Sequence, residues 1–203
     1  MKILFIPAKH KQTLNKEIVK EFSKLPKEIA ITYSIQYRDI AEEIKLFLSK
    51  SHNISNFTQV LGCSKPIFNK TKPKVTLLIG DGKFHALSLA YETKLPVYLF
   101  NNHKIERISE KEIKFLETKK KASYVNFLNS KNIGILISTK PGQQNLERAL
   151  KLRNKLKGKT PHLFISNEIN SSEFENFPQI QSWVNTACPR IDMTSQVINI
   201  KEI

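Results

Sequence analysis

The chain has few cysteines and no long apolar run, and both absences narrow its class. Its two cysteines, Cys63 and Cys188, stand 125 positions apart (188 − 63), so they do not make the dense disulfide framework of a small secreted domain. No run approaches the roughly 18–20 apolar residues that a membrane span needs. Residues 1–7 are too short, and too quickly followed by charge, for a secretory signal peptide. We therefore expect a cytoplasmic protein that does not enter a membrane.

Acidic residues are also scarce, since 18 Asp and Glu face 33 Lys and Arg and the formal net charge is +15. Such a surface attracts nucleic acid or an acidic protein. The lysines are scattered, however, and the densest cluster is only residues 119–121. The sequence shows neither a basic patch with interleaved aromatics nor zinc-finger spacing. Nucleic acid is therefore not the expected partner, although a basic module for nucleic acid or the ribosome stays an alternative.

The hydrophobic pattern of the 203 residues, 40% of which are hydrophobic, predicts alternating strands and helices. Residues 74–79 give the strongest strand prediction, because they are continuous, apolar and β-branched like strands of parallel sheets. Residues 15–25 and 40–49 carry apolar stripes at helical spacing. Further strands are predicted over residues 2–8, 28–34, 96–100, 133–138, 162–165, 183–184 and 197–200, helical segments over 86–92, 106–129, 145–157 and 171–174, and a turn over 53–56.

A strand–loop–helix pattern thus occurs twice, on either side of a long charged helical stretch. We predict an α/β protein with two similar small domains, whose parallel-type sheets are flanked by helices. The first domain covers residues 1–105, residues 106–129 form a helical connector, and the second domain covers residues 130–203. Each domain carries one cysteine. The order of the strands does not follow from the sequence.

Loops rich in glycine and polar residues follow two of the predicted strands, where open α/β sheets bind ligands. Gly80-Asp81-Gly82 allows close backbone approach, and the amides at the following helix start favour an anion. It lacks both the fuller dinucleotide fingerprint and the Walker A pattern, so a tight strand-to-helix turn explains it equally well. Residues 138–143 offer two hydroxyls, an ammonium group and a glycine. That set suits a carboxylate or phosphate, but an ordinary solvated loop has the same composition.

The cysteines allow several interpretations. Thiolates select zinc, copper(I) or iron–sulfur clusters, yet two cysteines cannot close a structural zinc site and the sequence has no Cys-x-x-Cys pair. A nucleophilic cysteine needs a positioned base, for which His85 or His162 is available. Two buried, inert thiols are the simplest alternative. The residues by themselves therefore predict an α/β protein with two cysteines at strand ends.

Four segments occur in an order and at spacings that resemble the 2-(3-amino-3-carboxypropyl)histidine synthase family. They are residues 59–63, 79–85, 138–143 and 185–192, and the resemblance extends from near residue 1 to about residue 200. It implies a transferase that carries out the first step of diphthamide biosynthesis, a modification of translation elongation factor 2. Four linked motifs are far more specific than any one of them.

The resemblance also implies the cofactors and the residues that bind them. Family members hold a 4Fe–4S cluster with three cysteines, one from each of three similar domains, and its open iron site engages S-adenosylmethionine. Cleavage of this cofactor gives a 3-amino-3-carboxypropyl radical, which adds to the imidazole C2 of one histidine in translation elongation factor 2. Cys63 and Cys188 fall on the ligand positions of the second and third domains. The cofactor pocket would be lined by Gln36, Gly80, Gly82, His85, Ser138, Lys140, Gln143 and Arg190, with Lys140 or Arg190 pairing with the methionyl carboxylate.

The chain departs from the family pattern in two places. The family's first domain and its cysteine have no counterpart, so we interpret the chain as an N-terminally truncated form in which residues 1–10 hold a strand of that domain. Tyr37 follows Gln36, where the family usually has a histidine. Because two thiolates make a poor cluster site, we expect an active enzyme only together with a separate polypeptide or related subunit that supplies the third cysteine. The alternative is a non-catalytic companion subunit that supports a partner's cluster.

Overall fold

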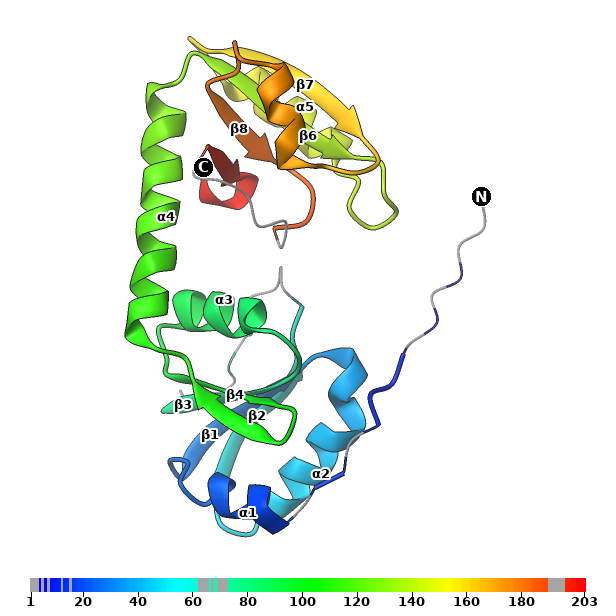
Figure 1. Ribbon diagram of the computed structural model, residues 1–203, viewed down its shortest axis with the longest axis vertical. Coiled ribbons are helices and arrows are strands. Elements are labelled where there is room, and N and C mark those ends of the chain that lie inside the picture. Colours follow the sequence, from blue (N-terminus) through cyan, green and yellow to red (C-terminus); the bar gives the residue numbers. More distant parts are fainter. Residues whose placement is uncertain are drawn as a thin grey trace. The chain divides into compact units, whose positions relative to one another are not determined.

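The computed structural model describes residues 4, 6, 8–11, 13–14, 16–61, 66, 68, 73–189 and 196–203, without the side chains of residues 16 and 17. They form two compact units, Met1–Lys114 and Phe115–Ile203, each of which is considered by itself. Both units consist of a mostly parallel sheet flanked by helices (Figure 1), so the predicted α/β class is confirmed. Among the described residues, no helix is long and apolar enough to cross a membrane.

The first unit has five strands in the order β2-β1-β3-β4-β5. The first four strands of this order are parallel, and β5 pairs antiparallel with β4. The strands are β1 (Glu28–Tyr33), β2 (Asn53–Gln59), β3 (Val75–Ile79), β4 (Val97–Asn101) and β5 (Lys104–Arg107); the helices are α1 (Lys16–Phe22), η1 (Ile35–Tyr37), α2 (Arg38–Leu48) and α3 (Lys83–Thr93).

Helices cover both faces of this sheet, which explains why β3 is apolar throughout. Leu77 and Ile79 pack with residues of α1 and α2 on one face, whereas Leu78 packs with Ala86 and Leu89 of α3 on the other. All five residues of β3 are buried. A strand buried on both faces has no polar side to show in its sequence, and this made its prediction the strongest.

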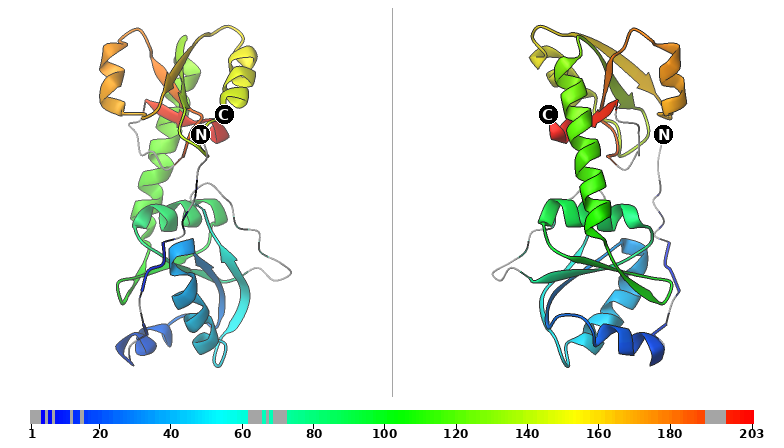
Figure 2. Two further views of the ribbon diagram at one scale, coloured as in Figure 1. Left: turned by 90° about the vertical axis from the view of Figure 1, so that its right-hand side faces the viewer. Right: turned by 60° about the vertical axis from the view of Figure 1, so that its left-hand side comes forward.

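The second unit has four parallel strands in the order β7-β6-β8-β9. Helix α5 and part of α4 cover one face, and the 3₁₀ helix η2 covers the other (Figure 2). The strands are β6 (Asn132–Ser138), β7 (Thr160–Ser166), β8 (Ser182–Asn185) and β9 (Val197–Asn199); the helices are α4 (Glu110–Asn129), α5 (Leu146–Lys155), η2 (Ser171–Asn176) and η3 (Ile200–Glu202).

The turn predicted over residues 53–56 is wrong, because these residues open the edge strand β2. Its backbone pairs with β1 from Asn53 to Gln59. An edge strand buries few side chains, and here only Asn56 is buried. Asn and Ser therefore fit the strand, although their local preference is for turns.

The structure corrects the connection between the two predicted domains. Strand β5 occupies residues that the sequence assigned partly to a helix, and α4 begins at Glu110 rather than at residue 106. Residues 104–107 pair with β4 as a hairpin. The strand predicted over residues 2–8 falls mainly outside the described residues. The predicted domain limits stay a prediction.

Candidate functional site

The two sheets share an order of parallel strands that creates one special position in each. In the first sheet the chain passes from β1 to β2 and then returns to β3 on the opposite side of β1. In the second sheet it passes from β6 to β7 and returns to β8 in the same way. The loops after β1 and β3, and those after β6 and β8, thus leave a topological switch point, where open α/β sheets bind ligands. Most of the predicted site residues that the structure describes lie in these four loops.

At the first switch point, the loop after β3 lies close against the loop after β1. The Ser34 amide donates a hydrogen bond to the Ile79 carbonyl at 3.1 Å. A Cβ on Gly80 would lie 3.0 Å from the Ser34 Oγ, so glycine permits this approach. Gly82, at φ 76°, precedes the first residue of α3. The structure thus brings Gln36, Gly80 and Gly82 to one end of the sheet.

A contact from the N-terminal segment adds two residues that the sequence analysis did not select. The His10 ring stacks on Tyr37 with 4.6 Å between centroids and 16° between planes. The His10 amide also donates to the Gln36 carbonyl at 2.9 Å. Tyr37 is buried, and this burial, followed by the charge of Asp81, raises the pKa of its phenol. His10 therefore holds the loop that carries Gln36 through both a ring stack and a backbone hydrogen bond. No local pattern in the sequence signals the stack.

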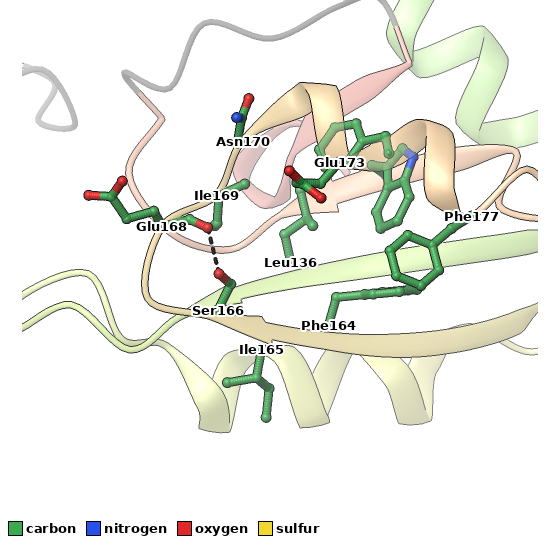
Figure 3. Close-up of a pocket in the computed structure, with 11 residues that line it drawn as sticks. Leu136, Phe164, Ile165, Ser166, Glu168, Ile169, Asn170, Glu173 and Phe177 are labelled. Atoms are coloured by element: carbon green, nitrogen blue, oxygen red, sulfur yellow. Dashed lines mark hydrogen bonds between the residues drawn. The ribbon is translucent and has the colours of Figure 1, made fainter.

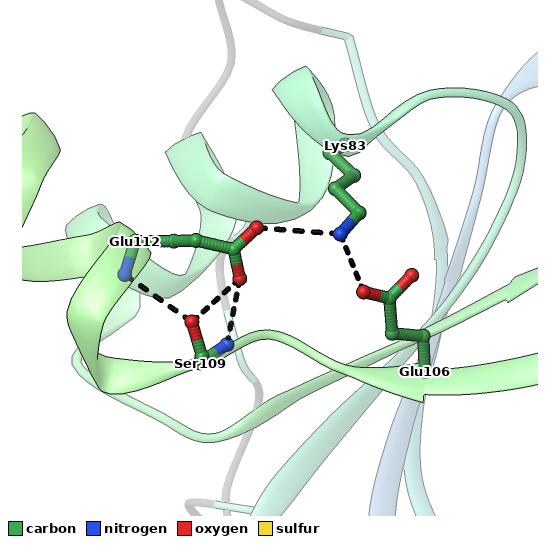
Figure 4. A network of polar contacts seen from close by, with 4 residues as sticks. All are labelled: Lys83, Glu106, Ser109 and Glu112. Carbon is green, nitrogen blue, oxygen red and sulfur yellow. Dashed lines mark hydrogen bonds and ion pairs between the residues drawn. The ribbon is translucent and has the colours of Figure 1, made fainter.

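His85 lies in the first turn of α3, partly buried, with its ring edge-on to Phe84 at 5.6 Å. Nearby Lys83 forms ion pairs with Glu106 of β5 and Glu112 of α4, as Figure 4 shows. Ser109 and Glu112 form a reciprocal cap, in which the Ser109 Oγ donates to the Glu112 carboxylate at 2.7 Å and accepts from the Glu112 amide at 3.2 Å. The Lys83 ammonium group therefore serves the attachment of α3 to β5 and α4.

The charges of this network are mutually stabilised. Hydrogen bonds from the Ser109 hydroxyl and amide lower the pKa of the Glu112 carboxyl. Hydrogen bonds to Glu106 and then Glu112 raise the pKa of the Lys83 ammonium group. Both groups are therefore ionised at neutral pH.

At the second switch point, the loop after β6 is folded onto Ser138, the last residue of that strand. Ser138 is buried, and its Oγ accepts from the Lys140 amide at 3.1 Å. The Gln143 amide donates to the Lys140 carbonyl at 3.0 Å, and Gly142, at φ 78°, completes the turn. The Lys140 Nζ lies 2.7 Å from the Glu168 carboxylate, and this contact lowers the pKa of Glu168. The lysine predicted to bind a carboxylate thus already holds one.

The loop after β8 fixes the backbone around Cys188. Asn185 is 1% exposed; its Nδ2 donates to the Cys188 carbonyl at 3.0 Å and to the Asn199 Oδ1 at 2.9 Å, and its Oδ1 accepts from the Ala187 amide at 2.9 Å. The Thr186 Oγ1 donates to the Leu136 carbonyl at 2.7 Å. Cys188 itself is a free, partly exposed thiol. The role of Asn185 was missed, since one asparagine at a strand end has no distinctive sequence signal.

The other two predicted site residues, Cys63 and Arg190, lie outside the described residues. In the chain, Cys63 comes four positions after β2, whereas Cys188 comes three positions after β8. Within the described part of the chain, no group of three or more His, Cys, Asp or Glu residues is arranged to hold a metal ion. The chemistry of the Cys188 thiol is that of a ligand for a soft metal.

Comparison with known proteins supports the motifs from which this site was built. Residues 1–197 match the family of diphthamide synthesis proteins. The 2-(3-amino-3-carboxypropyl)histidine synthase of Pyrococcus horikoshii is 30% identical over 190 residues, with 88% of this chain and 55% of the relative covered. The synthase of Methanocaldococcus jannaschii is 27% identical over an alignment of 224 residues, with 100% of this chain and 59% of the relative covered.

The fold comparison also gives a neighbour from Pyrococcus horikoshii. The crystal structure of Dph2 from Pyrococcus horikoshii with a 4Fe–4S cluster superimposes with a TM-score of 0.76 and 29% sequence identity, covering 92% of this chain and 59% of that one. Subunit 1 of the synthase from Yarrowia lipolytica is 28% identical over 140 residues, 66% of this chain and 32% of the relative. The chain therefore spans rather more than half the length of the Pyrococcus and Methanocaldococcus proteins.

Proposed function

Because the chain belongs to the diphthamide synthesis protein family, we propose that it takes part in the first step of diphthamide biosynthesis. In this step a 3-amino-3-carboxypropyl group is transferred from S-adenosylmethionine to a histidine of translation elongation factor 2. The observation that carries the proposal is the Cys188 loop. A free thiol follows β8 at a topological switch point, on a backbone fixed by Asn185 and Thr186. The order of the four sequence motifs and the similarity to named synthases support the same reaction.

The proposed cofactors are a 4Fe–4S cluster and S-adenosylmethionine. Cys63 and Cys188 would hold the cluster, since thiolate is the usual ligand of iron–sulfur clusters. The donor type fits. These 203 residues contain two cysteines, so a third thiolate would come from outside them, and its proposed source is a separate polypeptide or a related subunit. When bound, the reduced cluster supplies the electron that breaks the bond between the sulfur of S-adenosylmethionine and its amino-acid side chain.

The residues of this chain would bind and orient the cofactor. Lys140 or Arg190 would pair with the methionyl carboxylate in a charge-assisted contact. For Lys140, this means exchanging the Glu168 carboxylate, 2.7 Å away, for that of the cofactor. The cofactor pocket would be lined by the backbone of Gly80 and Gly82 and by the polar side chains of Gln36, His85, Ser138 and Gln143.

The partners and location follow from the reaction. Translation elongation factor 2 would be the substrate, which places the reaction in the cytoplasm. The relative from Yarrowia lipolytica is named as a subunit, which supports an enzyme of several chains. The net charge of +15 would accelerate encounter with an acidic partner surface.

The test is the iron and sulfide content, with the visible spectrum, after anaerobic reconstitution. It is run on the chain alone and together with candidate partner polypeptides from the same genome. We expect a stoichiometric cluster only with a partner. The resulting complex should then transfer label to elongation factor 2 from S-adenosylmethionine that is labelled in its 3-amino-3-carboxypropyl group. A complex without a cluster under these conditions would leave a companion or nucleic-acid-binding role.

Three variants decide whether the cysteines are ligands. Cys63→Ser and Cys188→Ser should each reduce the cluster content of the complex strongly, because a hydroxyl is a poor iron ligand. Ala187→Ser is the matched control, since it adds a hydroxyl in the same loop and keeps the thiol. Full cluster content in Cys188→Ser would remove Cys188 from the ligand set.

A further inference from the structure

The second unit contains a pocket that the proposed reaction does not use. It has a volume of about 220 Å³ and lies between β7 and η2. Figure 3 shows Phe164 and Phe177 on one side and Glu168 and Asn170 on the other, with Glu173 between them. Trp183 also lines the pocket and is only 2% exposed.

Aromatic rings make up most of the inner wall. Phe174 stacks on Trp183 with 4.3 Å between centroids and 16° between planes. Phe164 meets both Trp183 and Phe177 edge-on, with centroids 4.7 Å apart in each pair. The three phenylalanines are each partly exposed. The wall therefore combines a buried tryptophan ring with phenylalanine surface that a ligand can reach.

The rim of the pocket is negative in a chain that is otherwise strongly positive. Residues 160–189 contain three glutamates, Glu168, Glu173 and Glu175, and neither lysine nor arginine, whereas the whole chain has a net charge of +15. Glu168 is paired with Lys140. The Glu173 carboxylate accepts from the neutral Asn176 amide at 3.0 Å, and among the described residues no lysine or arginine forms an ion pair with it. Glu173 thus keeps an uncompensated negative charge beside the aromatic wall.

The chemistry of this pocket selects a cation on an apolar stem. Aromatic faces attract ammonium and guanidinium groups, and Arg does so most often because its planar group also stacks. A carboxylate at the rim adds a charge-assisted hydrogen bond. Pockets for whole cofactors and drug-sized ligands measure roughly 300–1,000 Å³, so about 220 Å³ suits one side chain rather than a nucleotide.

We propose that this pocket binds a single arginine side chain of a partner protein, with the guanidinium group against the phenylalanine rings and in contact with Glu173. The occupant is positively charged, whereas the rim of the pocket is negative. Because residues 160–189 contain neither lysine nor arginine, a second copy of this segment cannot supply the occupant. The proposal does not rest on the transfer reaction, because the described residues that line the pocket include neither Cys188 nor any residue assigned to the cofactor.

The chain offers its own reporter for this site, since Trp183 is its one tryptophan. The probe is the peptide acetyl-Gly-Arg-Gly-amide, titrated into the full chain at constant ionic strength and without cluster or S-adenosylmethionine. The matched peptide with citrulline in place of arginine has nearly the same shape and no charge. We expect a saturable change in Trp183 emission with the arginine peptide, at a dissociation constant on the order of millimolar, and little change with the citrulline peptide.

Two charge-neutralising variants separate the pocket from the general negative charge of the segment. Glu173→Gln should weaken binding of the arginine peptide by about two- to fivefold, the range of a partly exposed ion pair. Glu175→Gln, in the same 3₁₀ helix but outside the pocket lining, should leave the affinity unchanged.

Three outcomes would overturn the proposal. They are equal binding of the citrulline peptide, equal weakening by both variants, and no saturable change in either Trp183 emission or the amide NMR signals of Glu173 and Phe174. None of them affects the cluster proposal, whose test does not involve this pocket.

Discussion

The two units share one strand order, but the loops at their switch points are held in different ways. In the first unit, glycine lets the loop after β3 approach Ser34, and α3 begins immediately after Gly82. In the second unit, buried polar side chains hold the corresponding loops, through Ser138 at the end of β6 and Asn185 at the end of β8. One site is therefore set by the absence of side chains and the other by hydrogen bonds of buried side chains. Substitutions should affect the two units through different physical causes.

The positions of the cysteines differ as well. In the shared strand order, β2 corresponds to β7 and β3 corresponds to β8. Cys63 follows β2 in the chain, whereas Cys188 follows β8. The two thiols thus come after different strands of the common order. A single set of local contacts therefore cannot position both, and each cysteine needs its own supporting residues.

The largest expected difference in stability between the two units comes from adding a methyl group at one glycine of each unit. A Cβ on Gly134 would lie 2.3 Å from the Trp183 ring, in the adjacent strand, whereas one on Gly80 would meet the Ser34 Oγ at 3.0 Å. Gly134→Ala should lower the free energy of unfolding by about 3 kcal/mol, since the ring cannot move away in a packed core. Gly80→Ala should cost under about 1 kcal/mol, because the serine side chain can rotate.

Urea denaturation followed by Trp183 fluorescence and by circular dichroism measures both variants. The fluorescence reports the second unit alone, and circular dichroism reports both units. Equal midpoints for Gly134→Ala and the unchanged chain would contradict the packing of β6 against Trp183.

An intermediate effect is expected from the asparagines that end β8 and β4. Asn185→Ala removes three hydrogen bonds of a buried side chain and should destabilise the second unit by about 2 kcal/mol. It should also make alkylation of Cys188 by iodoacetamide faster. Asn101→Ala removes one hydrogen bond, to Asp81 at 3.0 Å, and a carbonyl oxygen that has no partner among the described atoms, so it should cost under about 1 kcal/mol.

Denaturation curves and mass spectrometry of the alkylated Cys188 peptide would check these values. An unchanged alkylation rate in Asn185→Ala would mean that the loop keeps its conformation without this side chain.

The smallest effect concerns the response of the first unit to acid. Hydrogen bonds from Ser109 lower the pKa of Glu112 below its ordinary value of 4.5. The carboxylate therefore contributes stability that is complete well above pH 4.5 and is lost as the pH falls through the lowered pKa. Glu112→Gln should be less stable than the unchanged chain at pH 7, by less than about 1 kcal/mol because the pair is exposed, and the difference should shrink as the pH falls below 4.5 and the carboxylate is protonated.

Thermal unfolding by circular dichroism at several pH values measures this difference. Trp183 fluorescence, which reports the second unit, is the internal control. A stability difference that does not shrink at any pH below 4.5 at which the chain is still folded would exclude the Glu112 carboxylate as its origin.

Most strands were predictable because burial on both faces or alternation shows directly in their composition, as in β3 and β6. Strand β2 was not predictable, because a strand at the edge of the sheet buries few side chains and therefore has no distinctive composition. The short strand β5 was missed because four residues with one apolar side chain, Ile105, resemble the start of the charged helix that follows.

The site was predictable only in part. The motifs identified the loops with Gly80, Ser138 and Cys188, but their meeting at switch points depends on strand order, which no local pattern records. The pairing of Lys140 with Glu168 joins residues 28 positions apart, and the aromatic pocket combines residues of β6, β7, η2 and β8 with residues of the loops on either side of η2. Long-range pairings of this kind follow from topology rather than from composition.

The strand β9 has a consequence for the motions of the Cys188 loop. It is three residues long, lies at the edge of its sheet, and is joined to β8 by three register pairs. So short a ladder opens locally at a much lower free energy than the whole unit. Amide-hydrogen exchange protection should therefore fall from β6 through β8 to β9. Each opening would break the contact between Asn185 and Asn199 and briefly loosen the backbone at Cys188. The partly exposed thiol would then become more accessible without unfolding of the sheet.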